Sequence, residues 1–265
     1  MSAPGQPRVA IVTGGGGGIG RALALALAKD GYHITIVGRS QSRLEMVLQE
    51  LYRVEPGDGS PEYLGLSLDV TREADMERMA SAVLERFRRI DLLITSAGLG
   101  KMTGSTRLLP HPTRDLPLAE WAEVIGINLT GVFLSNRAVL PAMVRQGVGH
   151  IVNICSSTTP HGLQGTPYAP AYCASKYGVV GFSEALAIEV APLGVRVQVV
   201  LPGPVVTPLV DQTLLARPFG GSVEPENFAA AVVYFIRQPS DEIIVHPHVL
   251  PCKSRPLADG REPKG

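Results

Sequence analysis

The chain has 265 residues, of which 45% are hydrophobic and 18% are charged, enough apolar side chains to bury a sizeable core; this excludes a mainly disordered protein. Its 24 Lys and Arg residues balance its 24 Asp and Glu residues. Because a net charge of zero offers no basic field to nucleic acid or anionic lipid, the composition favours a small molecule as the partner.

The sequence predicts neither a membrane span nor a disulfide framework. Its wholly apolar runs, such as residues 22–28, are far shorter than the roughly 20 residues that a membrane-spanning helix needs. The N-terminus carries no apolar signal segment, and Cys155, Cys173 and Cys252 have neither metal-ligand nor disulfide spacing. We therefore expect a protein of the reducing cytoplasm with no metal site.

Short β-branched runs alternate with longer helical patterns along the chain, an order typical of repeated βαβ units. The predicted strands cover residues 9–12, 33–37, 63–68, 91–94, 150–154, 195–200 and 243–249. The predicted helices cover residues 19–29, 41–53, 72–89, 118–145, 171–191 and 224–237. Nearly continuous apolar strands favour helices on both faces. The prediction is a single α/β domain over residues 1–252, doubly wound around a seven-stranded parallel sheet, and a flexible tail over residues 253–265.

A glycine-rich turn lies between the first predicted strand and the first predicted helix. It has the pattern T-G-x-x-x-G-x-G and contains Thr13, Gly14, Gly18, Ile19 and Gly20. Glycines let the backbone turn sharply and approach a pyrophosphate, whose charge meets the free N–H groups at the start of the helix. The alternative, a merely flexible loop, is disfavoured by the strand and helix on either side. The turn therefore predicts dinucleotide binding.

The end of the second strand indicates which dinucleotide binds. Gly38 has no carboxylate for a ribose 2′-hydroxyl, whereas Arg39, followed by Ser40, can pair with a 2′-phosphate. This favours NADP(H) over NAD(H), unless Arg39 is only a solvated surface residue. Asp69 and Val70 end the third strand, and Asp69 could either contact an adenine or serve as a helix N-cap.

Tyr172 and Lys176 are four residues apart in a predicted helix, which places a phenol and an ammonium on one face. Ser156 and Ser157 follow the strand before this helix, and Asn128 lies within the long helix before that strand. A Tyr-x-x-x-Lys pair alone is a weak signal, but the two serines and Asn128 strengthen it.

On these motifs the sequence resembles the short-chain dehydrogenase/reductase family, from about residue 9 to residue 249. The matching segments are residues 13–20, Ala97-Gly98, Asn128, residues 151–157, residues 172–176, Pro202-Gly203 and Thr207. The resemblance implies a Rossmann-type fold, an oxidoreductase, and a catalytic tetrad of Asn128, Ser156, Tyr172 and Lys176. It also implies that Ala97, Gly98, Pro202, Gly203, Val205 and Thr207 contact the cofactor, that Lys176 holds its ribose, and that Asn128 binds a water.

The implied chemistry needs a hydride and a proton for the oxygen of a ketone. A phenol with a pKa of about 10 is a poor base near neutrality, so we expect the ammonium of Lys176 to lower the pKa of Tyr172. A serine hydroxyl would hold the developing oxyanion.

The sequence departs from the family pattern at three places. The family's Asn-Asn-Ala-Gly is Thr95-Ser96-Ala97-Gly98, so fold stability there must rest on other bonds. Fifteen residues separate Ser156 from Tyr172, about three more than is usual, which keeps Ser157 open as the catalytic serine. Gly17 stands where NADP-preferring members often have a basic residue.

The predicted function is therefore NADP(H)-dependent interconversion of a ketone and a secondary alcohol, and the alternative is a catalytically silent dinucleotide-binding sensor or scaffold. We expect segments 99–106, 158–170 and 207–223 to surround an apolar substrate such as a 3-oxoacyl thioester, a steroid-like or a simple ketone. The apolar side chains expected there are Leu99, Met102, Leu163, Tyr168, Leu209, Val210, Leu214 and Phe219. By resemblance, the helices over 118–145 and 171–191 would form a homodimer or homotetramer.

Overall fold

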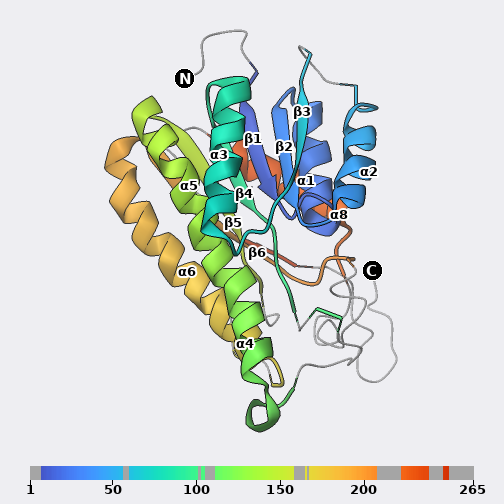
Figure 1. Cartoon of the computed structure of the whole chain (residues 1–265), viewed down its shortest axis with the longest axis vertical. Helices are drawn as coiled ribbons and strands as arrows, with labels where there is room; N and C mark the ends of the chain where they lie inside the picture. The colour runs from blue at the N-terminus through green and yellow to red at the C-terminus, as the bar shows by residue number, and fades with distance from the viewer. Residues whose placement is uncertain are drawn as a thin grey trace, which may run out of the picture.

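Seven parallel strands form one sheet in the order β3-β2-β1-β4-β5-β6-β7 (Figure 1). This computed structural model describes residues 7–55, 60–100, 103–104, 111–157, 165, 167–207, 222–238 and 247–250. The strands are β1 (Val9–Thr13), β2 (His33–Gly38), β3 (Tyr63–Ser67), β4 (Leu92–Thr95), β5 (Gly149–Ile154), β6 (Val195–Pro202) and β7 (His248–Val249). Because the strand order reverses between β1 and β4, a crevice for a ligand is expected at their carboxyl ends.

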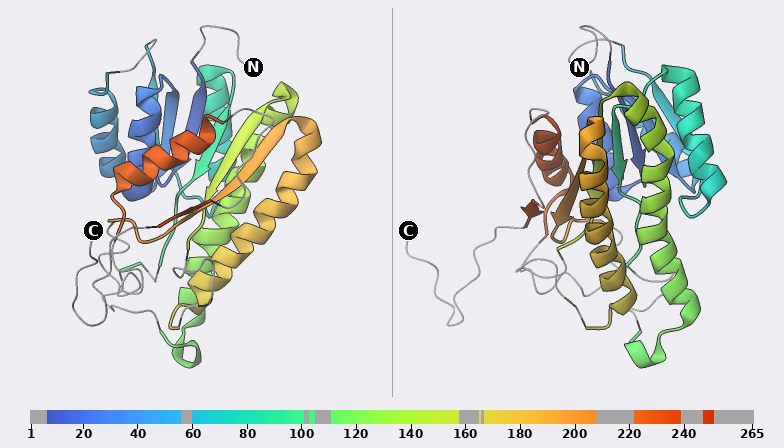
Figure 2. Two further views of the ribbon diagram at one scale, coloured as in Figure 1. Left: turned by 180° about the vertical axis from the view of Figure 1, so that it is seen from behind. Right: turned by 90° about the vertical axis from the view of Figure 1, so that its left-hand side faces the viewer.

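Helices cover both faces of the sheet, as the views from two further sides make clear (Figure 2). One face carries α1 (Gly18–Lys29), α2 (Gln41–Leu51) and α8 (Pro225–Ile236). The other carries α3 (Glu73–Phe87), α5 (Gly131–Gln146) and α6 (Pro170–Val190), and α4 (Leu118–Ile125) packs against α6. Short 3₁₀ turns lie at Thr113–Asp115 and Ala191–Leu193. The predicted doubly wound α/β fold is confirmed.

The strands in the middle of the sheet are buried on both faces because side chains alternate between two cores. In β1, Ala10 and Val12 belong to the core under α1 and α8, whereas Val9 and Ile11 belong to the core under α3 and α5. Burying one such aliphatic side chain stabilises the fold by about 1.5–3 kcal/mol. The same double burial explains why these strands are continuous apolar runs.

The long helix predicted over residues 118–145 is interrupted. A π-helical turn at Gly126–Thr130 separates α4 from α5 and contains Asn128, whose side chain is fully buried. The helical run Leu118–Gln146 is also the one stretch of the described chain long and apolar enough to cross a membrane, with a mean hydropathy of 1.2, and half of its most apolar window is buried inside the protein. Its buried side chains, such as Val139 and Met143, form part of the second core.

The other predicted elements agree with the structure to within about two residues, apart from the last strand. Only His248–Val249 of the predicted strand 243–249 is a strand, and residues 239–246 lie outside the described residues. Cys252 and the predicted tail 253–265 also lie outside them.

Polar side chains at the amino end of the sheet pair with one another. A carboxylate oxygen of Asp91 accepts hydrogen bonds from the N–H of Val9, at 2.8 Å, and from Nε of Arg89, at 2.7 Å. On the neighbouring strands, Nη2 of Arg196 lies 3.3 Å from Nδ1 of the buried His150. These bonds hold the strand starts in register.

Candidate active site

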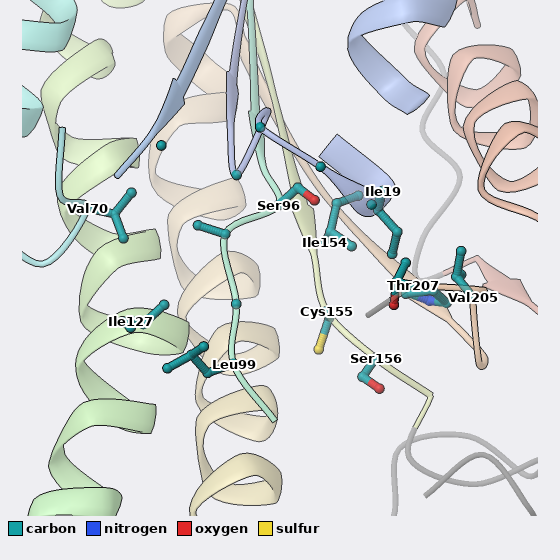
Figure 3. Close-up of a pocket in the computed structure, with 18 of the residues that line it drawn as sticks. Ile19, Val70, Ser96, Leu99, Ile127, Ile154, Cys155, Ser156, Val205 and Thr207 are labelled. Carbon is teal, nitrogen blue, oxygen red and sulfur yellow. The ribbon is translucent and has the colours of Figure 1, made fainter. Parts of the chain in front are cut away.

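One cavity of about 470 Å³ lies at the carboxyl ends of the central strands (Figure 3). Its walls come from the glycine turn, from the segments that follow β2, β3, β4, β5 and β6, and from the start of α6. Figure 3 shows Cys155 and Ser156 after β5, with Leu99 and Ile127 across the cavity. This is the crevice that the strand order predicts.

The glycine turn requires glycine at three positions. Gly14 and Gly18 have φ angles of 70° and 51°, and a Cβ on Gly20 would collide with the carbonyl oxygen of Gly14. A Cβ on Gly14 would lie 2.7 Å from the backbone nitrogen of Ala97, so this turn packs directly against the segment after β4. Gly14, Gly18, Ile19, Ala97 and Gly98 all line the cavity. The free N–H groups at the start of α1 and the backbone of the glycine turn thus form a site suited to a pyrophosphate.

Two residues of the predicted glycine site do not line the cavity. Thr13 is the last residue of β1 and is 1% exposed, and Gly20 is buried in the first turn of α1. Both residues lie beneath the turn, where α1 packs too closely against the chain after β1 to leave room for a ligand.

Arginines line the end of the cavity near α2. Arg39 and Ser40 lie there as predicted, and Ser40 caps α2 because its hydroxyl accepts a hydrogen bond from the N–H of Arg43 at 3.4 Å. Arg43 also lines the cavity, and a Cβ on Gly16 would lie 3.4 Å from the Cβ of Arg43. Sequence reasoning missed Arg43, although its spacing of four residues from Arg39 in a helical pattern was a usable signal.

Asp69 and Val70 line the same cavity. A carboxylate oxygen of Asp69 accepts hydrogen bonds from the N–H of Thr71 at 2.9 Å and from its hydroxyl at 2.8 Å, which forms an Asx turn. The N-cap of α3 is Arg72, so the N-cap alternative for Asp69 was wrong. The carboxylate keeps lone pairs free of these two bonds.

Tyr172, Ser156 and Lys176 meet at the other end of the cavity. α6 begins at Pro170, so Tyr172 and Lys176 lie one turn apart near its start, and the Tyr172 hydroxyl is hydrogen-bonded to the Ser156 side chain. Nζ of Lys176 donates to the carbonyl oxygen of Ile154 at 3.2 Å and lies 5.7 Å from the centre of the Tyr172 ring. Three polar side chains therefore line the same end of the cavity.

The electrostatics of this end differ from the expectation. Burial raises the pKa of Tyr172 to about 12, and the hydrogen bond to Ser156 only partly opposes it. Lys176 is not among the groups that shift this pKa, so the predicted lowering by its ammonium is not found. Burial lowers the pKa of Lys176 itself, while the neighbouring Cys155 raises it. The reason is that both side chains sit in a low-dielectric wall and Lys176 points to a carbonyl.

Asn128 does not line the cavity. Its Oδ1 accepts the N–H of Leu99 at 2.7 Å, and its Nδ2 donates to the carbonyl of Leu99 at 2.8 Å and to Oγ of Ser175 at 3.1 Å. The amide therefore fastens the segment after β4 to α6. A Cβ on Gly98 would lie 3.5 Å from Oδ1 of Asn128 and 3.9 Å from Nζ of Lys176, so Gly98 keeps the space in front of both open.

The two neighbouring serines have different partners. Ser157 is 3% exposed, and its hydroxyl lies 3.2 Å from the carbonyl oxygen of Leu201 and 2.7 Å from Nδ1 of His248. Ser156 instead bonds to Tyr172. The geometry thus favours Ser156 as the hydroxyl that shares a ligand atom with Tyr172.

A buried polar network replaces the missing family amides after β4. Oδ1 of Asn153 accepts from Oγ1 of Thr95 at 2.8 Å and from Nδ2 of Asn136 at 3.0 Å. Nδ2 of Asn153 donates to Oδ1 of Asn136 at 3.2 Å and to Oγ of Ser183 at 2.9 Å. Every donor and acceptor of this amide is used, which makes the network stabilising in a dry core. It ties β4 and β5 to α5 and α6.

The remaining predicted residues fall into three groups: those that line the cavity, one that is exposed elsewhere, and those outside the described residues. Pro202, Gly203, Val205, Thr207 and Leu99 line the cavity, whereas Tyr168 is 51% exposed and is not part of its lining. Met102, Leu163, Leu209, Val210, Leu214 and Phe219 lie outside the described residues. Ala169, which lies in the segment 158–170 expected around the substrate, also lines the cavity. Further lining residues that the sequence reasoning did not assign to the site are Gly16, Gly17, Gly38, Leu68, Ser96, Ile127, Ile154, Cys155 and Pro204.

Known proteins share both the sequence pattern and the fold. A family model described as short chain dehydrogenase matches residues 8–217. Levodione reductase from Leifsonia aquatica is 36% identical over 231 residues, which are 87% of this chain and 79% of the relative. An actinorhodin polyketide ketoreductase variant solved with NADPH has a TM-score of 0.79 at 32% identity, covering 92% of this chain and 96% of its own.

A 3-ketoacyl-(acyl-carrier-protein) reductase from Brucella melitensis, complexed with NADH, has a TM-score of 0.79 at 29% identity and covers 91% of this chain and 96% of its own. The relatives are thus named reductases, and the related structures hold nicotinamide dinucleotides. This chain belongs to the short-chain dehydrogenase/reductase family and is an oxidoreductase that binds a nicotinamide dinucleotide.

Proposed function

We propose that the protein is an NADP(H)-dependent oxidoreductase that interconverts a ketone and a secondary alcohol on a largely apolar substrate. One observation carries this proposal. The hydrogen-bonded Ser156 and Tyr172 hydroxyls and the amine of Lys176 lie at one end of the cavity, and the glycine turn and Arg39 lie at the other. A proton donor and a site for the phosphates of a dinucleotide thus lie in the same cavity.

The choice of NADP(H) rests on this chain's own residues, because the related structures include both NADPH and NADH. Gly38 offers no carboxylate to a 2′-hydroxyl, whereas Arg39, Ser40 and Arg43 surround the same end of the cavity. An arginine fork paired with a phosphate contributes roughly 1.5–3 kcal/mol per charge-assisted bond. Arg43 would supply the positive charge that Gly17 cannot.

Tyr172 is proposed as the general acid of the reduction. A nicotinamide dinucleotide held by the glycine turn and Arg39 would supply a hydride for the ketone carbon in reduction and would accept one in the reverse direction. The Tyr172 hydroxyl donates its proton to the ketone oxygen, and a pKa raised to about 12 keeps that proton in place at neutral pH. In alcohol oxidation the deprotonated Tyr172 oxygen would accept the proton of the alcohol.

Ser156 and Lys176 support this proton transfer. The Ser156 hydroxyl, already bonded to Tyr172, would donate to the same ketone oxygen and stabilise its developing charge. Lys176 would hold the cofactor's ribose, and the Leu99 segment that Asn128 fastens would close the space beside it.

The substrate end of the cavity favours an apolar ketone. Leu99, Cys155, Ala169 and Val205 line it, and both arginines of the described lining lie at the opposite end. A carboxylate or phosphate on the substrate would find no arginine fork there among the described residues. Simple ketones, steroid-like ketones and 3-oxoacyl thioesters all fit this chemistry.

The test is consumption of NADPH with a panel of these three ketone classes, followed by absorbance of the reduced nicotinamide. We expect turnover with at least one class and a lower dissociation constant for NADPH than for NADH. Tight NADPH binding without turnover on any ketone would contradict the reductase and leave a dinucleotide-binding sensor. Equal dissociation constants for the two cofactors would contradict the preference for NADP(H).

We also propose that the protein forms a homodimer or homotetramer through α5 and α6. These helices run side by side along one side of the molecule (Figure 2). Their outer faces expose Phe133 (39%), Tyr177 (48%) and Ile188 (79%), large apolar side chains that a second copy would cover. Light scattering that finds a monomer at micromolar concentration would contradict this assembly. We further propose that the protein is located in the cytoplasm, which cell fractionation tests.

A further inference from the structure

A hydrogen bond joins the wall of the active-site cavity to the edge of the sheet. Oγ of Ser157, next to Ser156 in the chain, lies 2.7 Å from Nδ1 of His248 in β7. Ser157 is buried, and His248 is exposed at the surface. The bond spans β6, because His248 pairs with Leu201 of that strand and Ser157 lies on its other side.

The single hydrogen of the Ser157 hydroxyl defines the direction of this bond. The Ser157 hydroxyl has one hydrogen and two contacts, the carbonyl oxygen of Leu201 at 3.2 Å and Nδ1 of His248. The carbonyl accepts only, so both bonds form together when Ser157 donates to Leu201 and His248 donates Nδ1–H to Ser157. His248 is then the donor that completes the serine's bonding.

The backbone around this bond leads to the cavity. The N–H of Ser157 donates to the carbonyl of Pro202 at 2.7 Å, and the N–H of Gly203 donates to the carbonyl of Val249 at 2.8 Å. The end of β6 and the residues after it, from Pro202 to Val205, line the cavity together with Ser156. The ends of β5, β6 and β7 are therefore locked together beside the reacting groups.

We propose that His248 is a positioning residue for the reaction: through Ser157 it holds Ser156 in place beside Tyr172. The inference rests on the proposed ketone reduction. The described part of β7 has two residues, and the side-chain bond from His248 to Ser157, which follows β5, ties it to chain on the far side of β6. Groups that must meet a ligand within a fraction of an ångström need such support.

Kinetics of four variants and one control variant test the role. His248→Ala and Ser157→Ala should each lower kcat about tenfold, less than the roughly 10²-fold cost of a 1 Å misplacement, while the dissociation constant of NADPH changes less than twofold. The double variant should resemble either single variant, because both break one bond. His248→Asn should restore kcat, since its amide N–H can replace Nδ1–H. Val249→Ala, a change in β7 outside the bond, is the matched control and should keep the wild-type kcat.

Two results would overturn the inference from these kinetics. Additive losses in the double variant would mean that the two residues act separately. A kcat in His248→Ala equal to the wild-type value would mean that the bond positions nothing.

An NMR measurement separates this inference from the proposed function. In ¹⁵N-histidine-labelled protein, Nδ1 of His248 should carry a proton, and its resonance should change in Ser157→Ala. In His248→Ala, the backbone resonances of Ser156 and Tyr172 should shift while those of Gly14 and Gly18 do not. If the wild type reduces no ketone yet these shifts appear, the proposed function fails and the positioning of Ser156 stands; unchanged Ser156 resonances overturn the positioning itself.

Discussion

The two ends of the sheet use buried polar groups in opposite ways. At the amino end, Asp91 bonds to Arg89 and to the backbone of Val9, and His150 lies against Arg196. At the carboxyl end, Ser156, Tyr172 and Lys176 border a cavity. The first set bonds within the protein, whereas the second converges on a space for a ligand.

The reason lies in the parallel topology. Every strand of a parallel sheet ends on the same side, where the following helices begin and offer free N–H groups. The strand starts have helix ends above them and no such donors, so polar side chains there bond mainly to one another, although Nε2 of the buried His150 has no hydrogen-bond partner. Substitutions at the carboxyl end should therefore change activity, and those at the amino end should change stability.

The largest expected effect is at the carboxyl end. Tyr172→Phe keeps the ring and its packing but removes the hydroxyl, so turnover should fall by about 10²- to 10⁴-fold while NADPH binding persists. Tyr177→Phe, in the next turn of α6, is the matched control. Initial rates and NADPH titration measure both effects. Wild-type turnover in Tyr172→Phe would mean that the proton comes from another group.

The titration of His150 tests whether the amino end of the sheet determines stability. Burial, aided by the charge of Arg196, lowers the pKa of His150 from 6.5 to about 3. The unfolded chain then binds more protons between these values, so the free energy of unfolding should fall as the pH falls, by about 3 kcal/mol between pH 7 and pH 4. Urea unfolding across this window measures it.

In His150→Gln this part of the pH dependence should disappear, because glutamine does not titrate. Equal slopes in the variant and the wild type would show that His150 is not the responsible group. NADPH binding at neutral pH should be the same in both, which keeps the two ends of the sheet distinct.

Arg39 sharpens the comparison within the cavity. Arg39→Ala should raise the dissociation constant of NADPH about 10- to 100-fold, because a charge-assisted pair is lost, and should leave that of NADH nearly unchanged. Arg53→Ala, an exposed arginine that does not line the cavity, is the control. A parallel loss for both cofactors would argue against a 2′-phosphate partner.

The smallest expected effect concerns Tyr32 at the amino end. Burial raises the pKa of Tyr32 to about 12, so the folded protein keeps a proton that the unfolded chain releases near its ordinary value of 10. Stability is complete below this value and falls as the pH rises toward 12, by about 1 kcal/mol at pH 11. Thermal unfolding of the wild type and Tyr32→Phe at pH 8 and pH 11 measures the difference. The variant should show the smaller alkaline loss.

Local patterns were enough to predict the elements and to name residues that line the cavity. The alternation of strands and helices, the glycine turn at Gly14 and Gly18, and the spacing of Tyr172 and Lys176 all act within one or two turns of chain. Such features depend on backbone conformation and side-chain periodicity, which neighbouring residues set. For this reason the cavity contains Arg39, Ser156 and Tyr172 as predicted.

Tertiary structure decided the partners of the polar groups. The separation of Ser156 from Ser157, the bonding of Asn128 to Leu99 and the contact of Ser157 with His248, 91 residues away, depend on strand order and on how helices pack over the sheet. The π-helical turn and the raised pKa of Tyr172 likewise follow from burial among distant segments. A linear pattern determines which groups the chain carries, but hydrogen-bond geometry and desolvation exist only once remote segments meet.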